Sequence, residues 1–319
     1  MNFDLELSPD QQAIDELFTT FFAKESPPSV ARAAEPRGFD AVLWDKLGAM
    51  GAPTMAVDGA TLADLVVMAE ALGRAIAPVP LLEHLVATRV VPDVEGIATV
   101  ALRPAVDGVW SLVPAGAIAD VVVGVDGDEL VAVRSTPPGD GPRNHASAPL
   151  ADRSTAGERN VVGPATTAFL DEWKALTAGA LVGIASAALD LGVEYAKARI
   201  QFGVPIGAFQ AVQQGLAELP GMIDGARLLT HKAAWAPTDG VVDTDDNDVA
   251  QRGALASMAF LFASDVAAHA TDRSLHYHGG YGFAEEYDIQ LFYRRARGWS
   301  LVLGDPAHEA LALADRLFA

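Results

Sequence analysis

The sequence predicts a mainly α-helical protein with a small β insert, and three observations support this fold class. Half of the residues are hydrophobic but only 7% are aromatic, so alanine, leucine and valine must do most of the packing, which suits closely packed helices. Apolar residues recur at helical spacing at both ends of the chain, and short β-branched runs lie between them. We therefore expect an N-terminal helical domain over 1–96, a reduced β domain over 97–162 and a C-terminal four-helix bundle over 163–319.

The N-terminal part contains several helix signals. Ser8, Pro9 and Asp10 are typical of a helix start, with a capping side chain followed by proline in the first turn. Apolar side chains then recur at helical spacing, at Leu17, Phe18, Phe21 and Phe22. Further helices are expected at Phe39–Met50, at Thr61–Ala77 and from Leu81 onward.

The segment from Ile97 to Val162 is typical of strands and turns. Its β-branched runs are VWSLVP, IADVVVGV and ELVAVRS, and Asp126-Gly127-Asp128 between the last two indicates a hairpin. The tract STPPGDGPRNHASAP is rich in turn formers and predicts an exposed loop.

Helical spacing returns from Thr166 onward. One apolar stripe is formed by Phe169, Trp173, Leu176, Ala180, Ile184, Leu191 and Tyr195. Glycine, alanine and serine between them are small enough to let another helix approach closely. The other helices of the predicted bundle are Ala208–Ala234, Val249–Leu275 and a last one from Ala307 to the end, with the acidic connector APTDGVVDTDDND after the first.

Composition and charge exclude several classes of function. The formal net charge of −20 repels phosphate backbones, so we expect no nucleic-acid partner. The chain has no cysteine, which excludes disulfides and fits a reducing compartment. No basic segment followed by an apolar core opens the chain, and charges interrupt the most apolar runs. We therefore expect a soluble, cytoplasmic protein with no membrane partner.

The stretch ARIQFGVPIGAFQAVQQGLAEL interrupts a helical pattern and restarts it on amide side chains. Gly203 weakens a helix and Pro205 biases the residue before it toward extended geometry, which explains the break. A guanidinium at a helix end, here Arg199, can hold phosphate oxygens, and paired glycines such as Gly279-Gly280 let backbone approach them. The alternative is that Arg199 only caps a helix and the glycines only form a turn.

Two long motifs resemble those of the acyl-CoA dehydrogenase family, in the same order, and the resemblance covers nearly the whole chain. The pattern R-x-x-F-G-x-P-I-x-x-F-Q-x-x-Q is matched at Arg199, Phe202, Gly203, Pro205, Ile206, Phe209, Gln210 and Gln213. The stretch HYHGGYGFAEEYDIQLFYRRAR is similar to the family's glycine-rich and R-D-A-[RK] segment, at Gly279, Gly280, Gly282, Phe283, Glu286, Tyr293, Arg294, Ala296 and Arg297. Upstream, MAEALGRAIAPVPLLEHL is similar to the end of the family's N-terminal domain.

In that family the two motifs grip the pyrophosphate and adenosine of FAD from across a subunit interface. The resemblance therefore implies that the nucleotide half of FAD is contacted by Arg199, Gln201, Phe202, Gln210, His276, Gly279 and Gly280. His276 stands in place of a glutamine and can replace it as a hydrogen-bond donor. Asp305 stands in place of a threonine near the cofactor, and a carboxylate there would be repelled by the pyrophosphate.

The residues that carry the family's chemistry are missing. Leu303 stands where the family has the glutamate of Y-E-G-T, its usual catalytic base, and leucine cannot take a proton. Trp173 stands at the alternative base position. Glu172 is adjacent and remains a weak alternative, because one residue of helix rotates a side chain by roughly 100°. The loop and strand that hold the flavin ring and thioester are replaced by ATVALRPAVDG and VPAGAIADVVV.

No metal site is expected. His276 and His278 lack an acidic partner at ligand spacing, and the glycines beside them indicate a turn. The DTDDND run is typical of a solvated acidic loop, because a calcium site would need a longer ligand set and a closing glutamate.

The resemblance implies a subunit of a heteromeric FAD-dependent acyl-CoA dehydrogenase, which performs α,β-dehydrogenation of an acyl-CoA. A paralogous partner would supply the base in a heterodimer or α2β2 heterotetramer, with electron-transfer flavoprotein as the acceptor. Short subunits of this kind resemble those of actinobacterial enzymes that act on steroid side-chain CoA esters. Two alternatives remain: a non-catalytic scaffold for a paralogous dehydrogenase, and a homo-oligomeric flavoprotein with relocated chemistry.

Overall fold

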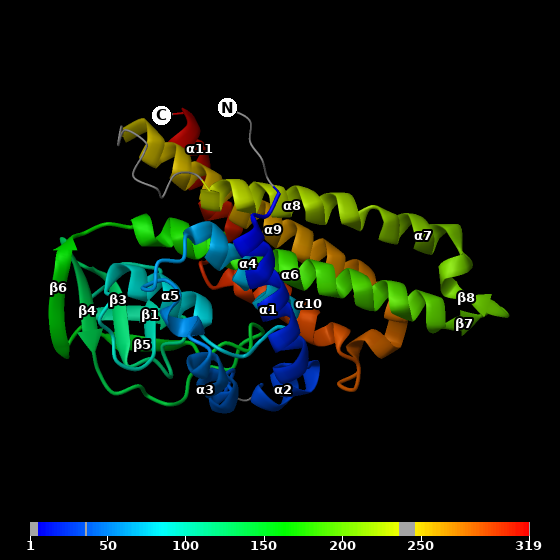
Figure 1. Ribbon diagram of the computed structural model, residues 1–319, viewed down its shortest axis with the longest axis horizontal. Helices are drawn as coiled ribbons and strands as arrows, with labels where there is room; N and C mark the ends of the chain where they lie inside the picture. Colours follow the sequence, from blue (N-terminus) through cyan, green and yellow to red (C-terminus); the bar gives the residue numbers. More distant parts are fainter. Residues whose placement is uncertain (1–5, 36, 236–245, 319) are drawn as a thin grey trace.

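A computed structural model describes residues 6–35, 37–235 and 246–318. It places a β sheet at one end of an elongated molecule and a long helical bundle toward the other (Figure 1). The N-terminal helices lie against the bundle near its middle, where α4 packs along α6. The predicted fold class, helices with a small β insert and a C-terminal helical bundle, is confirmed. The division at residues 96/97 and 162/163 stays a prediction.

The N-terminal part is built from short helices. They are α1 Pro9–Glu25, α2 Pro28–Ala34, α3 Ala41–Ala49, the 3-10 turn η1 Ala52–Thr54, α4 Leu62–Arg74 and α5 Leu81–Val90. Ser8 caps α1 in a reciprocal capping box with Gln11, as the N-terminal pattern predicts. The helix expected to reach Ala77 ends at Arg74, because Ile76 adopts a φ of +43° that a right-handed helix does not contain.

The β segment forms two small sheets. Its strands are β1 Ala98–Val100, β2 Val109–Val113, β3 Val121–Asp126, β4 Glu129–Arg134, β5 Ala151–Ser154 and β6 Glu158–Pro164. One sheet has the order β1-β3-β4-β6, with β1 parallel to β3 and the other pairs antiparallel, while β2 pairs with β5. The predicted hairpin joins β3 to β4, with Asp126 opposite Glu129 across a two-residue loop.

The loop between β4 and β5 differs from the prediction at its end. Its middle, around Gly141, is exposed, but Ala146 is buried and its carbonyl accepts a 3.1 Å hydrogen bond from Trp299 Nε1. A Cβ at Gly298 would lie only 2.3 Å from the backbone of Ala146, so the glycine permits this contact. The end of this loop therefore packs against α10 of the bundle. The turn-forming residues of the loop do not by themselves predict this contact.

The bundle has a different fourth helix from the predicted one. Its helices are α6 Ala168–Ala198, α7 Gln210–Ala217, α8 Leu219–Trp235, α9 Asp246–His278 and α10 Ile289–Leu301, followed by α11 Pro306–Phe318. The expected helix over Ala208–Ala234 is divided near Glu218, just before Pro220. Helix α10 is absent from the prediction because a buried arginine, Arg295, interrupts its apolar stripe. Helix α11, predicted as the fourth, has no buried residue.

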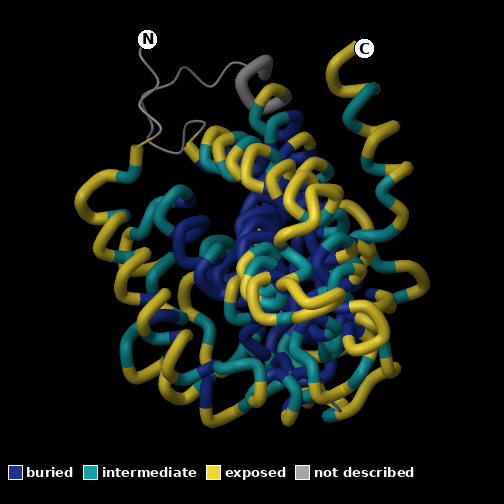
Figure 2. The backbone as a smooth tube through the Cα atoms, turned by 90° about the vertical axis from the view of Figure 1, so that its right-hand side faces the viewer, coloured by how far each residue is buried: buried dark blue, intermediate teal, exposed yellow. Residues whose placement is uncertain are grey.

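Helix α6 is the central element of the molecule, and Figure 2 shows buried backbone running through the middle of the fold. Residues 173–188 are buried all around rather than along one stripe. The small residues allow this: a Cβ at Gly183 would lie 2.0 Å from the Glu70 carbonyl oxygen of α4. On α4, a Cβ at Gly73 would lie 1.9 Å from the Ala180 carbonyl oxygen. The close helix approach expected from these residues is therefore present.

Two helices of the described chain are long and apolar enough to cross a membrane by length and composition, namely Ala168–Ala198 and Gln251–Phe283. This corrects the expectation that charges interrupt every such run. Most of each apolar window is buried inside the protein, 78% for the first and 61% for the second. Both helices therefore have the environment of core helices in this fold.

Candidate functional site

The break in the motif from Arg199 to Gln213 forms a small β hairpin at the tip of the molecule. Strand β7 (Ile200–Gln201) pairs with β8 (Val204–Pro205) across the two-residue turn Phe202-Gly203 (Figure 1). Both turn residues have positive φ, +54° at Phe202 and +81° at Gly203, as in the tight hairpin turns that glycine favours. Phe202 is 92% exposed. A bulky residue in this backbone region is strained, which points to a role for its exposed ring.

The glycine-rich part of the second motif, Gly279–Phe283, forms the turn that follows α9. After His278 the chain enters the 3-10 turn η3 (Gly279–Phe283), and Gly279 has a φ of +60°. A Cβ at Gly279 or at Gly280 would meet no atom of the described residues within 4 Å, so these residues leave the space over both glycines open. Gly282 differs, because it is buried and packs against Leu275. The first two glycines therefore leave backbone accessible to a ligand, whereas the third serves packing.

The two motifs meet in space although about seventy residues separate them. The guanidinium of Arg199 lies 5.3 Å from the centroid of the Tyr281 ring, in cation–π geometry. Behind them, the Tyr277 hydroxyl donates a long 3.4 Å hydrogen bond to the Ala211 carbonyl. A Cβ at Gly215 would collide with this hydroxyl, so the glycine lets α7 approach α9. The fold thus places the hairpin and the glycine turn side by side.

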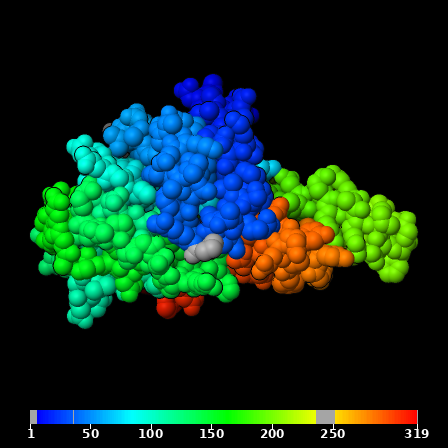
Figure 3. All heavy atoms as spheres, turned by 90° about the horizontal axis from the view of Figure 1, so that it is seen from below, coloured from blue at the N-terminus to red at the C-terminus, as the bar shows by residue number. Residues whose placement is uncertain are grey.

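This end of the bundle is exposed and apolar, and we call it the distal face. Its large exposed apolar side chains are Ile200, Phe202, Val204, Phe209, Tyr281 and Phe283. Figure 3 shows the segment around residues 200–220 projecting from one end of the molecule beside the segment around residue 280. Exposed clusters of apolar side chains usually mark an interaction surface.

The predicted polar contacts also lie on the distal face. Gln201, Gln210 and His276 are all exposed, and the Gln201 side chain donates to the neighbouring Ile200 carbonyl. His278 is instead buried, with Nδ1 2.7 Å from the Ser274 carbonyl oxygen, and burial lowers its pKa. The two histidines therefore lie in different environments. Within the described ranges, no group of three or more histidine and acidic side chains could hold a metal ion.

The two positions where the resembled family carries its base lie far from this face. Leu303 is half-buried, and its carbonyl accepts a 2.8 Å hydrogen bond from Arg103, which also donates to the Val302 carbonyl. Arg103 belongs to the segment that replaces the family's flavin-ring loop. A guanidinium therefore ties that segment to the base position.

Trp173, at the second base position, is buried against Phe260. Glu172 lies beside it and accepts a 2.8 Å hydrogen bond from Arg89 on α5. Because this carboxylate is already paired with a guanidinium and does not line the cavity next to Trp173, its placement does not favour a role as base.

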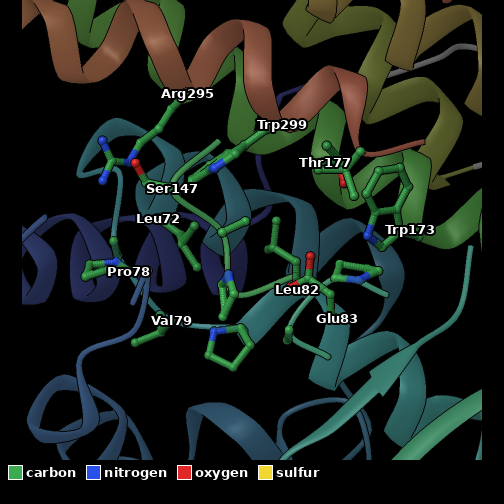
Figure 4. Close-up of a pocket in the computed structure, with 18 residues that line it drawn as sticks. Leu72, Pro78, Val79, Leu82, Glu83, Ser147, Trp173, Thr177, Arg295 and Trp299 are labelled. Carbon is green, nitrogen blue, oxygen red and sulfur yellow. The ribbon is translucent and has the colours of Figure 1, made fainter. Parts of the chain in front are cut away.

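A cavity of about 70 Å³ lies where the N-terminal helices, the β segment and the bundle meet (Figure 4). Its walls include Leu72, Pro78, Val79, Pro80, Leu82, Pro114, Pro149 and Val302. Trp173 and Thr177 of α6 also line it. Thr177 Oγ1 has no hydrogen-bond partner within the described chain, and Trp173 Nε1 makes no hydrogen bond of ordinary length there, although the indole lies close enough to the Glu83 carboxyl to favour its charged form. Buried polar atoms without partners are uncommon in native proteins.

Two ionisable side chains border the cavity. Burial raises the pKa of the Glu83 carboxyl on α5, although the Trp173 side chain favours its charged form, and Figure 4 shows Glu83 facing the same space as Trp173. Burial lowers the pKa of Arg295 to about 10 in spite of the nearby Glu35 carboxylate, which also pairs with Arg294. Sequence reasoning missed Glu83. The available signal was a single carboxyl between leucines at the start of an apolar helix.

Comparisons with known proteins identify the family. The acyl-CoA dehydrogenase C-terminal domain matches residues 164–318, and the acyl-CoA dehydrogenase N-terminal domain matches residues 8–99. The chain is also 31% identical to acyl-CoA dehydrogenase IpdE2 of Mycolicibacterium smegmatis, over 98% of this chain and 100% of that protein. It belongs to the acyl-CoA dehydrogenase family. A second IpdE2, from Mycobacterium tuberculosis, is 30% identical over 93% of this chain and 94% of that protein.

Solved structures of acyl-CoA dehydrogenases share the fold. A variant of the steroid acyl-CoA dehydrogenase Tcur3481-Tcur3483 superposes with a TM-score of 0.80 at 26% identity, covering 97% of both chains. The ChsE4-ChsE5 complex from Mycobacterium tuberculosis superposes with a TM-score of 0.81 at 22% identity, covering 99% of both chains. These likenesses confirm the acyl-CoA dehydrogenase fold.

Acyl-CoA dehydrogenases are FAD-dependent oxidoreductases that act on CH–CH bonds, and the residues present fit one half of that cofactor. The open space over Gly279 and Gly280, beside the Arg199 guanidinium, suits the phosphates of the nucleotide half. At the base position of the described chain the ring half has less room, because Arg103 bridges to Leu303 and the nearby cavity of about 70 Å³ is too small for a tricyclic ring.

Proposed function

We propose that this chain is one subunit of a heteromeric acyl-CoA dehydrogenase, in which it holds the nucleotide half of an FAD bound mainly by a paralogous partner. One observation carries the proposal. Both FAD-type motifs converge on the exposed distal face, with Arg199 beside the open backbone of Gly279 and Gly280, whereas both base positions hold apolar side chains.

The residues of the distal face have separate tasks in this proposal. Arg199 presents its planar fork to the pyrophosphate oxygens, and the glycine turn offers backbone N–H groups at close range. The exposed Phe202 ring packs against the partner or against the adenine, which accounts for its strained, fully projecting position. Gln201, Gln210 and His276 supply hydrogen bonds to the adenosine.

The reaction is α,β-dehydrogenation of an acyl-CoA thioester. FAD, when bound, would supply the acceptor for the β-hydrogen as hydride, and electron-transfer flavoprotein would be the final acceptor of the electrons. The α-proton passes to a carboxylate of the partner, because the base positions of this chain, Leu303 and Trp173, carry no proton acceptor. This chain therefore binds and orients the cofactor and takes no part in the proton transfer.

We propose a steroid-derived acyl-CoA ester as the substrate class and a cytoplasmic heterodimer or α2β2 heterotetramer as the assembly. The similarity to a steroid acyl-CoA dehydrogenase over 97% of this chain supports the substrate class. An apolar distal face on a chain of net charge −20 supports association with a different, less acidic chain, because two copies would repel each other.

Co-expression with the paralogous subunit from the same source tests the proposal. Flavin absorbance in the purified complex but not in the lone chain is the expected result. Flavin in the lone chain would indicate a homo-oligomeric flavoprotein instead. An active complex that retains its flavin after Arg199→Ala would indicate a scaffold that does not touch the cofactor.

A further inference from the structure

A second cavity, of about 310 Å³, lies beside the loop between β4 and β5. Residues of that loop form one wall, and the other walls include Glu35 and Arg37, which lie between α2 and α3, and Arg294 of α10. Loop residues 140–143 are exposed, so the cavity opens to solvent. Most of its described lining residues are charged, polar or glycine, in contrast to the proline and leucine side chains of the smaller cavity. A polar ligand can therefore enter it from solution.

The loop wall of this cavity is held in a fixed shape. The Asn144 side-chain amide donates to the carbonyls of Pro142 and Ala148 at 2.9 and 2.8 Å, and its oxygen accepts from the Ala148 N–H. Ser147 has a φ of +46°, a strained value for a residue other than glycine. A Cβ at Gly38 would lie 2.3 Å from the Ser147 carbonyl oxygen, so this glycine lets the α2–α3 connection pack directly on the loop. Strained backbone that its surroundings hold in place is common at ligand sites.

Two arginines that line this cavity, Arg37 and Arg143, have no ion pair or side-chain hydrogen bond within the described ranges. Arg143 is exposed on the loop, and the Arg37 guanidinium lies 5.9 Å from the centroid of the Phe39 ring, which leaves its N–H groups available. Most arginines of the described chain instead donate to a carboxylate or to a backbone carbonyl, as Arg103 does. Arg199, the expected phosphate ligand, is another exception. Guanidinium groups without a protein acceptor, gathered in one cavity, indicate an anionic ligand.

The local charge supports the same conclusion. Arg294 also lines the cavity, and it shares the Glu35 carboxylate with the buried Arg295, so two guanidinium groups balance that one negative charge. Asp140 is the other carboxylate among the described lining residues. The lining is therefore positive overall, on a chain whose net charge is −20. A positive hollow in a negatively charged protein concentrates small anions.

We propose that this cavity binds a small phosphate monoester whose organic part carries hydroxyl groups. The phosphate accepts hydrogen bonds from Arg37 and Arg143, whose planar forks match its oxygens. A hydroxyl group donates to the Asp140 carboxylate. A volume of about 310 Å³ holds more than a phosphate group alone, at roughly 10–15 Å³ for each water-sized atom, so the organic part also has room.

Other anions fit less well. A dicarboxylate can also occupy both guanidinium groups, but it brings no donor to Asp140 and faces it with like charge. Inorganic phosphate leaves most of the cavity to water. A nucleic-acid backbone is disfavoured by the charge of the whole chain. The described lining includes no residue of the distal face, so this site and the proposed flavin contact are tested separately.

Glycerol 3-phosphate, a small hydroxylated phosphate monoester, is the probe. Isothermal titration calorimetry at low salt should detect binding to the co-expressed complex and to the isolated chain, with a dissociation constant of about 0.1–1 mM. Inorganic phosphate and succinate should each bind about tenfold more weakly, and glycerol should give no binding heat. Arg37→Gln and Arg143→Gln, which each remove a charged donor, should each weaken binding of glycerol 3-phosphate by about tenfold.

Arg297→Gln is the matched control. It removes the same charge from α10, but Arg297 lies outside the described lining of the cavity, where its guanidinium contacts the Tyr293 ring and Asp272. It should leave binding unchanged, and circular dichroism shows whether each variant is folded.

The proposal is overturned if glycerol 3-phosphate gives no binding heat, or if succinate or inorganic phosphate binds as tightly. It is also overturned if the Arg37 and Arg143 variants bind like the original chain. A loss of binding in Arg297→Gln equal to theirs would equally overturn it, because a general effect of charge would then explain the result.

Discussion

At the scale of single residues, the molecule separates side chains that face a ligand from side chains that hold the fold. Arg199 and Arg295 illustrate the difference. The first lies over an exposed tyrosine at the distal face, whereas the second is 1% exposed and bonds with Glu35 and with backbone carbonyls. The two arginines look alike in sequence, and only their surroundings distinguish a guanidinium that a ligand could reach from one that is buried and paired within the fold.

The first prediction concerns Arg199. If its guanidinium holds a pyrophosphate, Arg199→Ala should weaken FAD binding to the heteromeric complex by roughly 1.5–3 kcal/mol, the usual contribution of a charge-assisted hydrogen bond. Equilibrium dialysis against free FAD measures the change. Arg159→Ala, which removes an arginine paired with Glu129 on the β sheet, is the control. Equal FAD retention by both variants, in intact complexes, would remove Arg199 from the proposed site.

The second prediction concerns His84, whose Nδ1 accepts a 3.0 Å hydrogen bond from the backbone N–H of Ala98 at the start of β1. Burial lowers the pKa of this imidazole from 6.5 to about 4. Because the unfolded chain binds the proton more readily, the stabilisation is complete above about pH 6.5 and is lost as the pH falls toward 4. This lowering of the His84 pKa to about 4 corresponds to about 3 kcal/mol of folding stability at neutral pH.

Urea unfolding between pH 7 and pH 4 checks this prediction. His84→Gln should be less stable than the original chain at pH 7 and should lose less stability on acidification, so that the two curves converge. The background from titrating carboxylates is common to both chains and cancels in the difference. An exposed histidine changed in the same way, His145→Gln, is the control. Parallel curves for the original chain and His84→Gln would contradict the assignment.

At the scale of elements, the contact between the β segment and the end of α10 has the clearest consequence. Arg103 donates to the carbonyls of Val302 and Leu303 at 3.2 and 2.8 Å, and these carbonyls follow the last turn of α10. A guanidinium at a helix C-terminus also interacts favourably with the helix dipole. This contact occupies the place between the replaced flavin-ring loop and the replaced base.

We expect Arg103→Ala to open that contact. Amide hydrogen exchange should become faster over residues 299–304 and 101–105, by an amount that corresponds to about 1–3 kcal/mol of local opening free energy. Arg103→Lys should restore part of the protection from exchange, because the lysine ammonium can still donate a hydrogen bond but lacks the planar set of donors of the guanidinium. Arg134→Ala, which removes a comparable bond to the Glu95 carbonyl, is the control. Unchanged exchange in both segments would show that the bridge does not hold them together.

At the scale of the whole molecule, charge and apolar surface together favour association with a different chain. The distal face exposes Phe202 by 92% and Phe283 by 71%, on a chain of net charge −20. Repulsion between two such chains is screened beyond about 8–10 Å at physiological salt, so it weakens homo-association without preventing aggregation through apolar contacts.

We therefore expect the isolated protein to aggregate or express poorly, and a less acidic paralogous subunit to rescue it as a stable complex. Size-exclusion chromatography with light scattering measures both outcomes. Phe202→Asp should weaken the complex, whereas Val106→Asp, at another exposed apolar position on the β segment, should leave it intact. A soluble monomer that neither binds the paralogue nor acquires flavin with it would contradict the heteromeric assembly.

Local chemistry along the chain was sufficient to predict much of this protein. The cap at Ser8, the hairpin at Gly127 and the break at Gly203 follow from residues that act on their own neighbours. The two long motifs were sufficient to identify the family, because spacing over many positions is specific. They also showed which chemical groups are absent, since leucine at position 303 cannot take a proton wherever it lies.

Other features of the fold depend on tertiary contacts, which the hydrophobic periodicity of the sequence does not predict. Helix α10 can bury Arg295 because the guanidinium pairs with Glu35, which lies 260 residues earlier in the sequence, and no local signal reveals that partner. The convergence of Arg199 with Tyr281 depends on the packing of α6, which ends at Arg199, against α9, which precedes the turn of Tyr281. The cavity at Glu83, Trp173 and Thr177 exists only where two helices from distant segments meet. Burial and pairing are properties of the assembled chain, so these features required the three-dimensional structure.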